Sequence, residues 1–366
     1  MNKAVIIGDS THNTLSIVRS LGAEKIPFIL LLKSDDDYCN VLRSKYVRRN
    51  EVHVIKNIKE CGNLLDKIIE VDKPFLICTF DEAAEWIDEH EESLSQKFVT
   101  PCRGKHIGNL FNKDEQCKLA QECGLTVPKT IIFDREDAYP LTDADYPVIL
   151  KPLYSTGGEK SDIHICRNAD DFKKALAASS DCCTFVIQEF IEKEYELDCI
   201  GVVTENDILI SGAVQKIRHY PHLIGAGAYG FFRPISELDI NSSGLTKFLK
   251  RSNYHGPFSV EFVHAAGKNY FMEVNFRNEG LAQVSTAAGA NLHALYVNDA
   301  MKFNLQKVHK IYMMNYAIDY LHVKEGRISK MKWWRDFMRT RCFINFSISD
   351  PMPVVAHYLK KLHLLK

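Results

Sequence analysis

Short apolar runs alternate with amphipathic segments in the first part of the chain. Strand-sized apolar runs and helix-like segments follow one another at 4–7, 13–21, 28–32, 58–71 and 75–78. Strands that alternate with helices indicate βαβ units and a parallel sheet. The turn after the first strand, Gly8–Asn13, is not a GxGxxG sequence, so the dinucleotide-binding fingerprint is absent. We therefore predict an α/β domain over residues 1–108, in which a ligand would bind at the carboxyl ends of the strands.

Strand-like runs outnumber helices after residue 108. Strands are predicted at 147–152, 162–166, 185–191, 199–203 and 208–214, and helices at 112–123, 243–252 and 288–303. A loop is expected at 221–230, followed further on by a β-hairpin over 259–277. This pattern predicts an α+β domain over residues 109–304, with the basic segment 305–366 as a C-terminal extension.

The predicted hairpin concentrates polar side chains on one face. Glu261 lies on its first strand, and Glu273, Asn275 and Arg277 alternate along the second. If the turn centres on Gly267, Glu261 lies directly opposite Glu273. Two carboxylates and an amide oxygen suit a hard cation, most plausibly Mg²⁺. Arg277, just beyond, is placed to hold an anion next to that metal.

Two lysines are candidate phosphate ligands. Lys151 ends an apolar strand and precedes a loop with Ser155, Gly157 and Gly158, whose backbone N–H groups can approach a phosphate. Many strands end in lysine, so this motif is weak by itself. Lys113 opens a helix, where its charge opposes the helix dipole, although a solvated lysine is the usual explanation.

The strand that ends near residue 191 is a candidate nucleotide-binding edge. Its backbone is free to bond an adenine edge at Gln188, Glu189, Phe190 and Ile191. Glu194 or Glu196 would then bind ribose hydroxyls. A solvated, charged strand face explains these residues equally well in isolation.

The order of these motifs resembles the ATP-grasp superfamily over residues 109 to about 304, and the α/β segment before it resembles the domain that precedes ATP-grasp domains. The stretch Lys193–Asp198 is similar to the nucleotide-binding segment of the carbamoyl phosphate synthetase large subunit. Asn2–Val47 resembles a branch of ATP-grasp carboxylate ligases related to D-aspartate ligase. The resemblance implies a pre-ATP-grasp domain followed by a two-lobed ATP-grasp domain, with the smaller lobe at about 125–190.

The resemblance also implies roles for the motif residues. Lys113 and Lys151 would bind the nucleotide phosphates. The backbone of Glu189–Ile191 would bind adenine, and Glu194 would bind ribose. One or two Mg²⁺ ions would be held by Glu261, Glu273 and Asn275, and Mn²⁺ would be able to substitute for Mg²⁺. Arg277 would stabilise the transferring phosphoryl group or hold the carboxylate substrate.

The implied reaction is ATP-dependent activation of a small carboxylate as an acyl phosphate, which an amine attacks with release of ADP and phosphate. A thiol acceptor, or nucleotide binding without ligase activity, is the alternative. Two departures motivate the latter: the family often has Asn-Pro-Arg where this chain has Asn275-Phe-Arg277, and the glycine loop is short.

Two further segments are candidates for substrate contact. Lys216 and Arg218, at the start of a glycine-containing loop, are suited to a carboxylate or phosphate, although a surface loop with solvated bases is equally compatible. His12 and Asn13 follow the first strand and are placed to orient the second substrate. The alternative, which we favour, is that Asn13 caps the following helix.

The composition of the chain limits the classes of partner that we expect and favours one cellular compartment. The net charge is −1 and the pI about 6.9, so no global field recruits nucleic acid. The 11 cysteines include no CxxC pair, and the first residues lack a signal peptide, so we expect a reducing cytoplasm. Homo-oligomer formation stays open.

The last part of the chain is basic. From Met301 onward, 13 Lys and Arg face 4 Asp and Glu, and Trp333-Trp334 lies within this region. Such a segment is suited to peripheral contact with an anionic membrane. A C-terminal helix that packs its aromatic face on the body is the interpretation that we favour.

Overall fold

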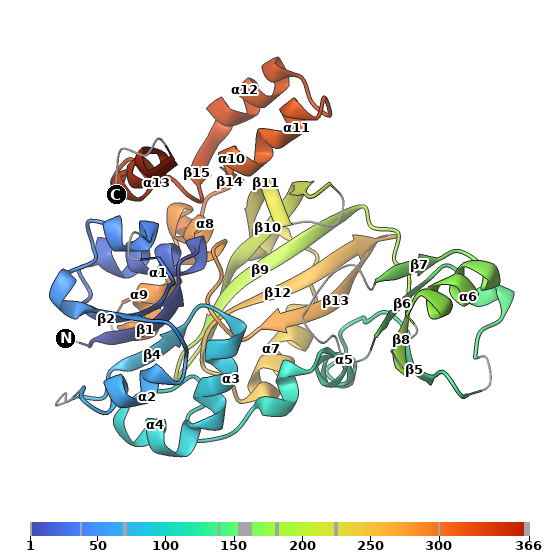
Figure 1. The fold of residues 1–366 in the computed structure, drawn as a ribbon, viewed down its shortest axis with the longest axis horizontal. Coiled ribbons are helices and arrows are strands. Elements are labelled where there is room, and N and C mark those ends of the chain that lie inside the picture. Colours follow the sequence, from blue (N-terminus) through green and yellow to red (C-terminus); the bar gives the residue numbers. More distant parts are fainter. Residues whose placement is uncertain are drawn as a thin grey trace.

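The computed structural model describes residues 2–36, 39–68, 72–137, 140–152, 163–179, 183–222, 226–298 and 301–361. Its first unit is a parallel four-stranded sheet with strand order β3-β2-β1-β4 (Figure 1). The strands are β1 Ala4–Asp9, β2 Phe28–Lys33, β3 Val52–Ile55 and β4 Phe75–Cys78. The helices of this unit are α1 His12–Ala23, α2 Glu60–Leu65, α3 Asp81–Glu89 and α4 Glu91–Lys97. The predicted N-terminal parallel sheet is therefore confirmed.

The central strand β1 is buried on both faces, as its continuous apolar run requires. Ala4 and Ile6 pack in a core that contains α1 and also the later helices α8 Ala282–Ala287 and α9 Leu292–Val297. Val5 and Ile7 pack in a second core formed with α2 and α3. The N-terminal sheet and the large sheet described below thus share the α1, α8 and α9 layer, which fixes one unit against the other.

The smaller lobe is an antiparallel sheet with order β5-β8-β6-β7, covered by one helix and placed at the right of Figure 1. Its elements are β5 Thr130–Asp134, β6 Val148–Pro152, β7 His164–Cys166, α6 Ala169–Ala178 and β8 Thr184–Glu189. The helix α5 Lys113–Glu122 precedes it. Phe172 of α6 is fully buried against Leu150 and Phe185, so this lobe has a core of its own.

A seven-stranded sheet with order β13-β12-β9-β10-β11-β14-β15 forms the centre of the molecule. Its strands are β9 Tyr195–Val203, β10 Ile208–Tyr220, β11 Ala226–Pro234, β12 Gly256–Ala265, β13 Lys268–Asn275, β14 Ile311–Met314 and β15 Thr340–Phe343. The helix α7 Ser242–Ser252 precedes β12. Two strands of the predicted C-terminal extension thus continue the large sheet, β14 beside β11 and β15 parallel to β14.

The C-terminal region adds the helices α10 Tyr316–Asp319, α11 Leu321–Lys324, α12 Lys330–Arg339 and α13 Met352–Lys361. The helix α12 projects from the body at the top of Figure 1. Within the described residues, no helix is both long and apolar enough to cross a bilayer.

Two predicted segments differ from the structure. The helix expected at 288–303 is wrong, because Gly289, at φ +105°, separates α8 from α9, which ends at Val297. The loop expected at 221–230 is shorter, because β11 begins at Ala226 and pairs with β10.

Candidate active site

The hairpin β12–β13 places the two predicted metal-binding glutamates side by side. Glu261 pairs with Glu273 across the strands, as the sequence predicts. The turn itself is a two-residue turn at Ala266 and Gly267, with φ of 49° and 72°. That turn alone would set Glu261 against Met272. One extra residue at Met272 shifts the register, and this bulge restores the pairing with Glu273.

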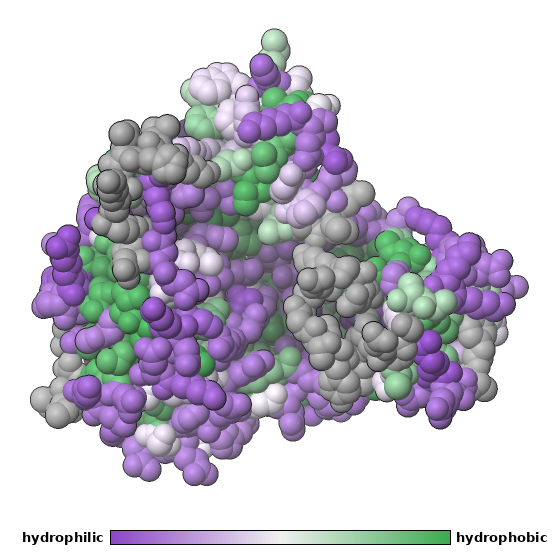
Figure 2. Space-filling model, viewed as in Figure 1, coloured by the Kyte–Doolittle hydropathy of each residue, from purple (hydrophilic) through white to green (hydrophobic). Residues whose placement is uncertain are grey.

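A cavity of about 480 Å³ lies between α5, the smaller lobe and the large sheet. The face drawn in Figure 2 is hollowed and largely hydrophilic at its centre. Eight of the residues expected at the site line this cavity: His12, Lys113, Lys151, Gln188, Glu196, Lys216, Glu261 and Glu273. These residues come from three separate units of the fold. Folding therefore brings His12 and Glu273, which are 261 positions apart in the sequence, to the same cavity.

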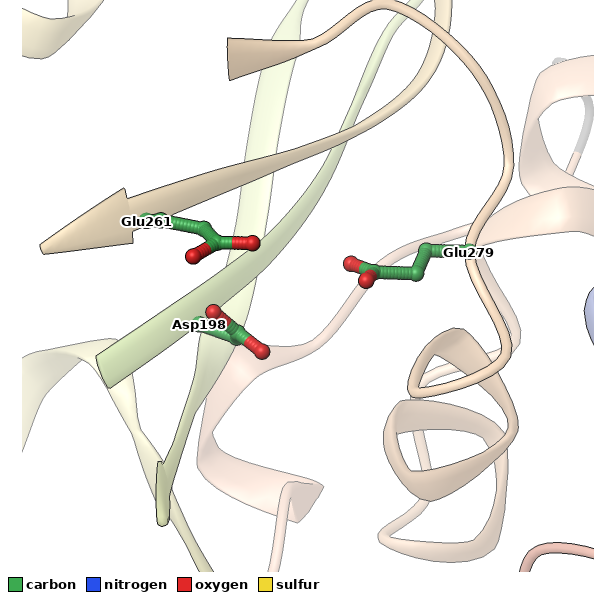
Figure 3. A group of neighbouring side chains, drawn as sticks. All are labelled: Asp198, Glu261 and Glu279. Carbon is green, nitrogen blue, oxygen red and sulfur yellow. The ribbon is translucent and has the colours of Figure 1, made fainter. Parts of the chain in front are cut away.

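Three carboxylates meet at one end of the cavity (Figure 3). Ligand oxygens of Asp198 on β9, Glu261 on β12 and Glu279 after β13 all lie within 4.8 Å of one another. Asp198 Oδ1 and Glu279 Oε2 are buried and, among the described residues, have no hydrogen-bond partner. Buried, unpaired carboxylate oxygens at this spacing fit a hard divalent cation.

Asp198 and Glu279 were missed in the sequence. Asp198 follows Glu196 by two positions on the same strand, and Glu279 follows Arg277 by two, so the alternation that singled out the hairpin residues also reaches them. Asp198 lies opposite Glu261 in the β9–β12 register, which only the strand order reveals.

Lys216 on β10 is buried beside this cluster. Its Nζ lies 3.1 Å from Asp198 Oδ2, 3.3 Å from Glu196 Oε2 and 3.7 Å from Glu261 Oε2. Burial alone lowers the pKa of Lys216, but the surrounding carboxylates, Asp198 foremost, raise that pKa well above its usual value. Lys216 is therefore a fixed positive charge at the carboxylate end of the cavity.

The carboxylates respond differently to this environment. Burial raises the pKa of Asp198 well above its usual value, against the opposing charge of Lys216. Burial also raises the pKa of Glu261 to about 6; Lys216 opposes this shift, and the negative charges of Glu273 and Glu279 reinforce it. Glu196 is the exception. Burial would raise its pKa, but a hydrogen bond from His219 and the charge of Lys216 lower it overall.

The two predicted phosphate-binding lysines line the same cavity. Lys113, at the start of α5, forms an ion pair with Glu273. Burial lowers the pKa of Lys113, but Glu273 outweighs burial and raises it. Burial and the positive charge of Lys113 both lower the pKa of Lys151 on β6. Two lysines close enough to repel one another suit a polyanionic ligand.

Asn275 and Arg277 form a link to the N-terminal domain rather than to the lining of the cavity. Asn275 Nδ2 donates to Ser259 Oγ at 3.2 Å, and its Oδ1 accepts from Arg277 Nη2 at 3.2 Å. Arg277 Nε donates to Asp81 Oδ1 of α3 at 2.5 Å. Arg277 Nη1 is buried and has no hydrogen-bond partner in the described part of the chain. One donor of this guanidinium is therefore left for a ligand.

The predicted nucleotide-binding edge is only partly free. Glu189 N donates to Lys129 O at 2.8 Å and Phe190 N to Pro147 O at 3.2 Å, so both donors serve the smaller lobe. Neither these two residues nor Ile191 lines the cavity, whereas Gln188 does. Glu194 is exposed and accepts from Ala266 N at 3.0 Å.

Glu196 rather than Glu194 therefore points into the cavity, where His219 Nε2 lies 3.1 Å from its Oε2. The predicted phosphate-loop residues Ser155, Gly157 and Gly158 lie outside the described residues.

The two predicted substrate-binding bases, Lys216 and Arg218, point in different directions, and only Lys216 lines the cavity. Arg218 donates twice to Asp319, at 2.8 Å each, and once to Asp336 at 2.7 Å, so its guanidinium is directed into the C-terminal helices. A break in the β10–β11 register between Lys216 and Arg218 accounts for their different directions. The structure therefore does not bring Arg218 to the cavity.

His12 lines the cavity, but Asn13 does not. Thr11 caps α1 by accepting from Asn13 N, so the capping role that we favoured for Asn13 is wrong. Asn13 Oδ1 instead accepts from Gly280 N at 2.8 Å, which joins α1 to the segment that carries Glu279.

No protein-family model matches the chain. The carbamoyl phosphate synthase large chain of Saccharolobus solfataricus is 25% identical over 214 residues, which are 54% of this chain and 19% of that protein. The large chain from Gemmatimonas aurantiaca is 26% identical over 158 residues, 40% of this chain and 14% of the relative. The chain thus matches less than a fifth of the length of these relatives.

Solved structures resemble the whole arrangement. The L-amino acid ligase from Bacillus licheniformis has a TM-score of 0.60 at 15% identity, covering 85% of this chain and 79% of its own. The N5-carboxyaminoimidazole ribonucleotide synthetase from Thermus thermophilus has a TM-score of 0.64 at 13% identity, with 84% and 82% covered.

The biotin carboxylase domain of the Hydrogenobacter thermophilus 2-oxoglutarate carboxylase, solved with ADP, magnesium and bicarbonate, has a TM-score of 0.63 at 15% identity, with 84% and 73% covered. Identities this low establish the fold alone. The sequence relatives and these folds together confirm the predicted resemblance: this chain is similar to the ATP-grasp ligases and has their fold.

Proposed function

We propose that the protein is an ATP-dependent ligase that activates a small carboxylate as an acyl phosphate for attack by an amine, releasing ADP and phosphate. The single observation that carries this proposal is one cavity lined both by two lysines and by a three-carboxylate cluster: Lys113, Lys151, Asp198, Glu261 and Glu279. Transfer of the γ-phosphoryl group from metal-bound ATP requires two things close together: positive side chains that bind the phosphates, and carboxylates that bind the metal ion.

Mg²⁺ fits the carboxylate cluster. Glu261 is common to two groups of ligands: it faces Glu273 across the hairpin and lies with Asp198 and Glu279 in the three-carboxylate cluster. These carboxylates would hold one or two ions, and Mn²⁺ is expected to substitute for Mg²⁺. Asn275 is outside this set of ligands, because it does not line the cavity and its amide oxygen accepts from Arg277.

The protein side chains supply charge and position rather than a covalent nucleophile. Lys113 and Lys151 would neutralise the phosphates, and Lys216 is placed for the charge that develops on the transferring group. An acyl phosphate turns a poor electrophile into one that an amine attacks readily. His12 and Glu279 border the cavity beside the N-terminal domain, where the acceptor would reach the intermediate.

The direct test is product analysis with panels of acids and amines. We expect ADP and phosphate to form only when both substrates are present. AMP and pyrophosphate would contradict the phosphoryl-transfer proposal. Tight ATP binding without turnover on a broad panel would instead support a nucleotide-binding protein without ligase activity.

The variant Glu273→Gln tests the assignment of the site. We expect it to lower turnover about 100-fold or more and to weaken Mn²⁺ binding, because it removes one carboxylate from the cation and from Lys113. Glu115→Gln is the matched control, since Glu115 lies on the same helix as Lys113 but pairs with Lys118 on the surface. Turnover that is unchanged in Glu273→Gln would rule out Glu273 as a metal ligand.

A further inference from the structure

Exposed apolar side chains gather in the C-terminal region. Of the thirteen large apolar side chains that are exposed in the described part of the chain, seven fall within 28 residues: Met331, Trp334, Met338, Ile348, Met352, Val355 and Tyr358. The first three belong to α12, the helix that projects at the top of Figure 1. Exposure this concentrated marks an interaction surface.

The helix α12 has two different faces. Its inner face packs: Trp333 lies 5.2 Å from Phe337 between ring centroids, and the buried Asp336 accepts from Arg218. Its outer face carries Met331, Trp334 and Met338, which follow one another at helical spacing and are 83%, 58% and 66% exposed. The favoured alternative from the sequence, an aromatic face packed on the body, therefore describes only the inner face.

Basic residues border this apolar stripe on both sides. Lys330 lies on one side, and Lys332, Arg335 and Arg339 lie on the other, as their spacing on a helix dictates. All four are exposed. The first turn of α12 contains two lysines and no acid, which opposes the helix dipole, so helix stability does not account for them.

The acids of this region are neutralised, and its two aspartates on the sheet side point inward. Asp319 and Asp336 are buried on Arg218, which reaches them from β10. The exposed Glu325 pairs with Arg327. The outer surface is therefore strongly positive, and its exposed bases are Lys324, Arg327, Lys330, Lys332, Arg335, Arg339 and Arg341.

A cavity of about 380 Å³ adjoins the stripe. Lys332 and Arg339, at the border of the stripe, also line this cavity, together with Arg327, His222 and His322. Neither Lys332 nor Arg339 forms an ion pair within the described residues. Cations that converge without a partner favour a phosphate group.

We propose that the outer face of α12 docks on an anionic phospholipid bilayer. Trp334, Met331 and Met338 enter the interface between headgroups and acyl chains, and Lys332 and Arg339 bind headgroup phosphates. A single convex helix with a Trp-containing stripe between two rows of bases suits a fluid, anionic surface. This inference does not depend on the ligase reaction, because none of these residues lines the cavity of the proposed active site.

Flotation of the full-length protein with vesicles tests the proposal. We expect binding to vesicles of phosphatidylcholine with phosphatidylglycerol, little binding to phosphatidylcholine alone, and release by salt. The double variant Lys332→Gln, Arg339→Gln should weaken partitioning on the order of 25-fold, about fivefold for each charge removed. Trp334→Ser should weaken partitioning without changing the salt dependence.

The matched control is the double variant Lys247→Gln, Lys250→Gln, which removes the same charge from exposed positions on α7. It should bind like the wild type. Equal binding of both double variants, or no binding of the wild type to anionic vesicles, would overturn the proposal. Retention on an acidic protein surface with no vesicle binding would assign the face to a protein partner instead. Thermal unfolding of each variant verifies that the fold is intact.

Discussion

Lys216 and Asp198, on neighbouring strands of the large sheet, form a buried ion pair with 3.1 Å between Nζ and Oδ2. Glu196 and Glu261 also lie within 4 Å of the same Nζ. The Nζ of Lys216 is therefore the buried cation that three carboxylates share, although Glu196 also pairs with Lys193.

Lys216→Met should lower the free energy of unfolding by about 3 kcal/mol at neutral pH in the absence of metal, because it leaves buried negative charge unpaired. Urea unfolding measures the effect. Lys118→Met removes an exposed lysine that pairs with Glu115, and it should change stability far less than Lys216→Met, because solvent screens an exposed pair. Divalent cations should restore part of the stability of Lys216→Met. Equal stability of the two variants would contradict a structural role for Lys216.

His293 predicts how stability depends on pH. Burial lowers the pKa of His293 from 6.5 to about 3, and its Nε2 is bonded to Asn278 Oδ1. Between pH 6.5 and 3 the imidazole of His293 is therefore protonated in the unfolded chain but stays neutral in the folded protein. Stability should fall as the pH is lowered through this window, by up to about 1.4 kcal/mol per pH unit from this group.

His293→Gln keeps a donor for Asn278 but cannot take up a proton, so its stability should fall less steeply between pH 6.5 and 4. The exposed His53→Gln on β3 should keep the slope of the wild type. Denaturant midpoints at several pH values check both. A slope of His293→Gln that matches the wild type would show that other groups dominate the acid response.

Gly280 predicts a steric coupling between the two domains. A Cβ at position 280 would lie 2.0 Å from His12 Cδ2 and 3.0 Å from Asn13 Oδ1. Gly280→Ala should therefore cost about 1–3 kcal/mol. His12→Ala in the same chain should recover most of that loss, because it removes the clashing ring.

A double-mutant cycle measures this coupling, with an expected interaction energy of at least about 1 kcal/mol. Gly62→Ala in α2 is the control: the atom nearest to its added Cβ is 3.9 Å away, so the change should be neutral or stabilising. Additive effects at positions 12 and 280 would place the cost elsewhere.

Asp350 predicts that the C-terminal segment is needed for the fold. Its buried carboxylate accepts from Arg19 Nε at 3.0 Å, from Ser44 Oγ at 2.9 Å and from Lys45 N at 2.9 Å. Asp350→Ala should lower the unfolding free energy by about 3–5 kcal/mol, because Arg19 is left as a buried, unpaired charge.

Asp66→Ala removes an exposed acid that pairs with Lys97, and it should cost less than about 1 kcal/mol. Thermal unfolding compares the two variants. If Asp350→Ala were as stable as Asp66→Ala, the C-terminal segment would not hold the N-terminal domain.

The sequence predicted the local features of the site well, because they depend on periods of two and four residues. Alternation on β13 identified Glu273, which lines the cavity, and the apolar runs identified the parallel sheet. The same alternation also selected Asn275 and, beyond the strand, Arg277, which do not line the cavity. Asp198 and Glu279 escaped because they meet Glu261 only through strand order and the chain path after the hairpin. Spacing alone does not contain that information.

Arg218 is the opposite case, a residue that was predicted at the site but does not reach it. Two positions after Lys216 on one strand, it should share the same face, but the register breaks between them. Its partners Asp319 and Asp336 lie more than 100 residues further along the chain. The sequence analysis placed Arg218 in a loop with Lys216, and a bulge has no signature in the apolar pattern, so the opposite directions of the two side chains were not predicted.

Met272 carries a consequence for the evolution of the hairpin. As the single extra residue of β13, it lines the cavity beside Glu273, while Val274 is buried. Loss of Met272 would remove the bulge but leave Glu273 opposite Glu261, because the turn alone pairs Glu261 with the position that Met272 now occupies. The hairpin can therefore lose this one residue in evolution without separating the two glutamates, so the site inherits the strand pairing and not a fixed number of residues between them.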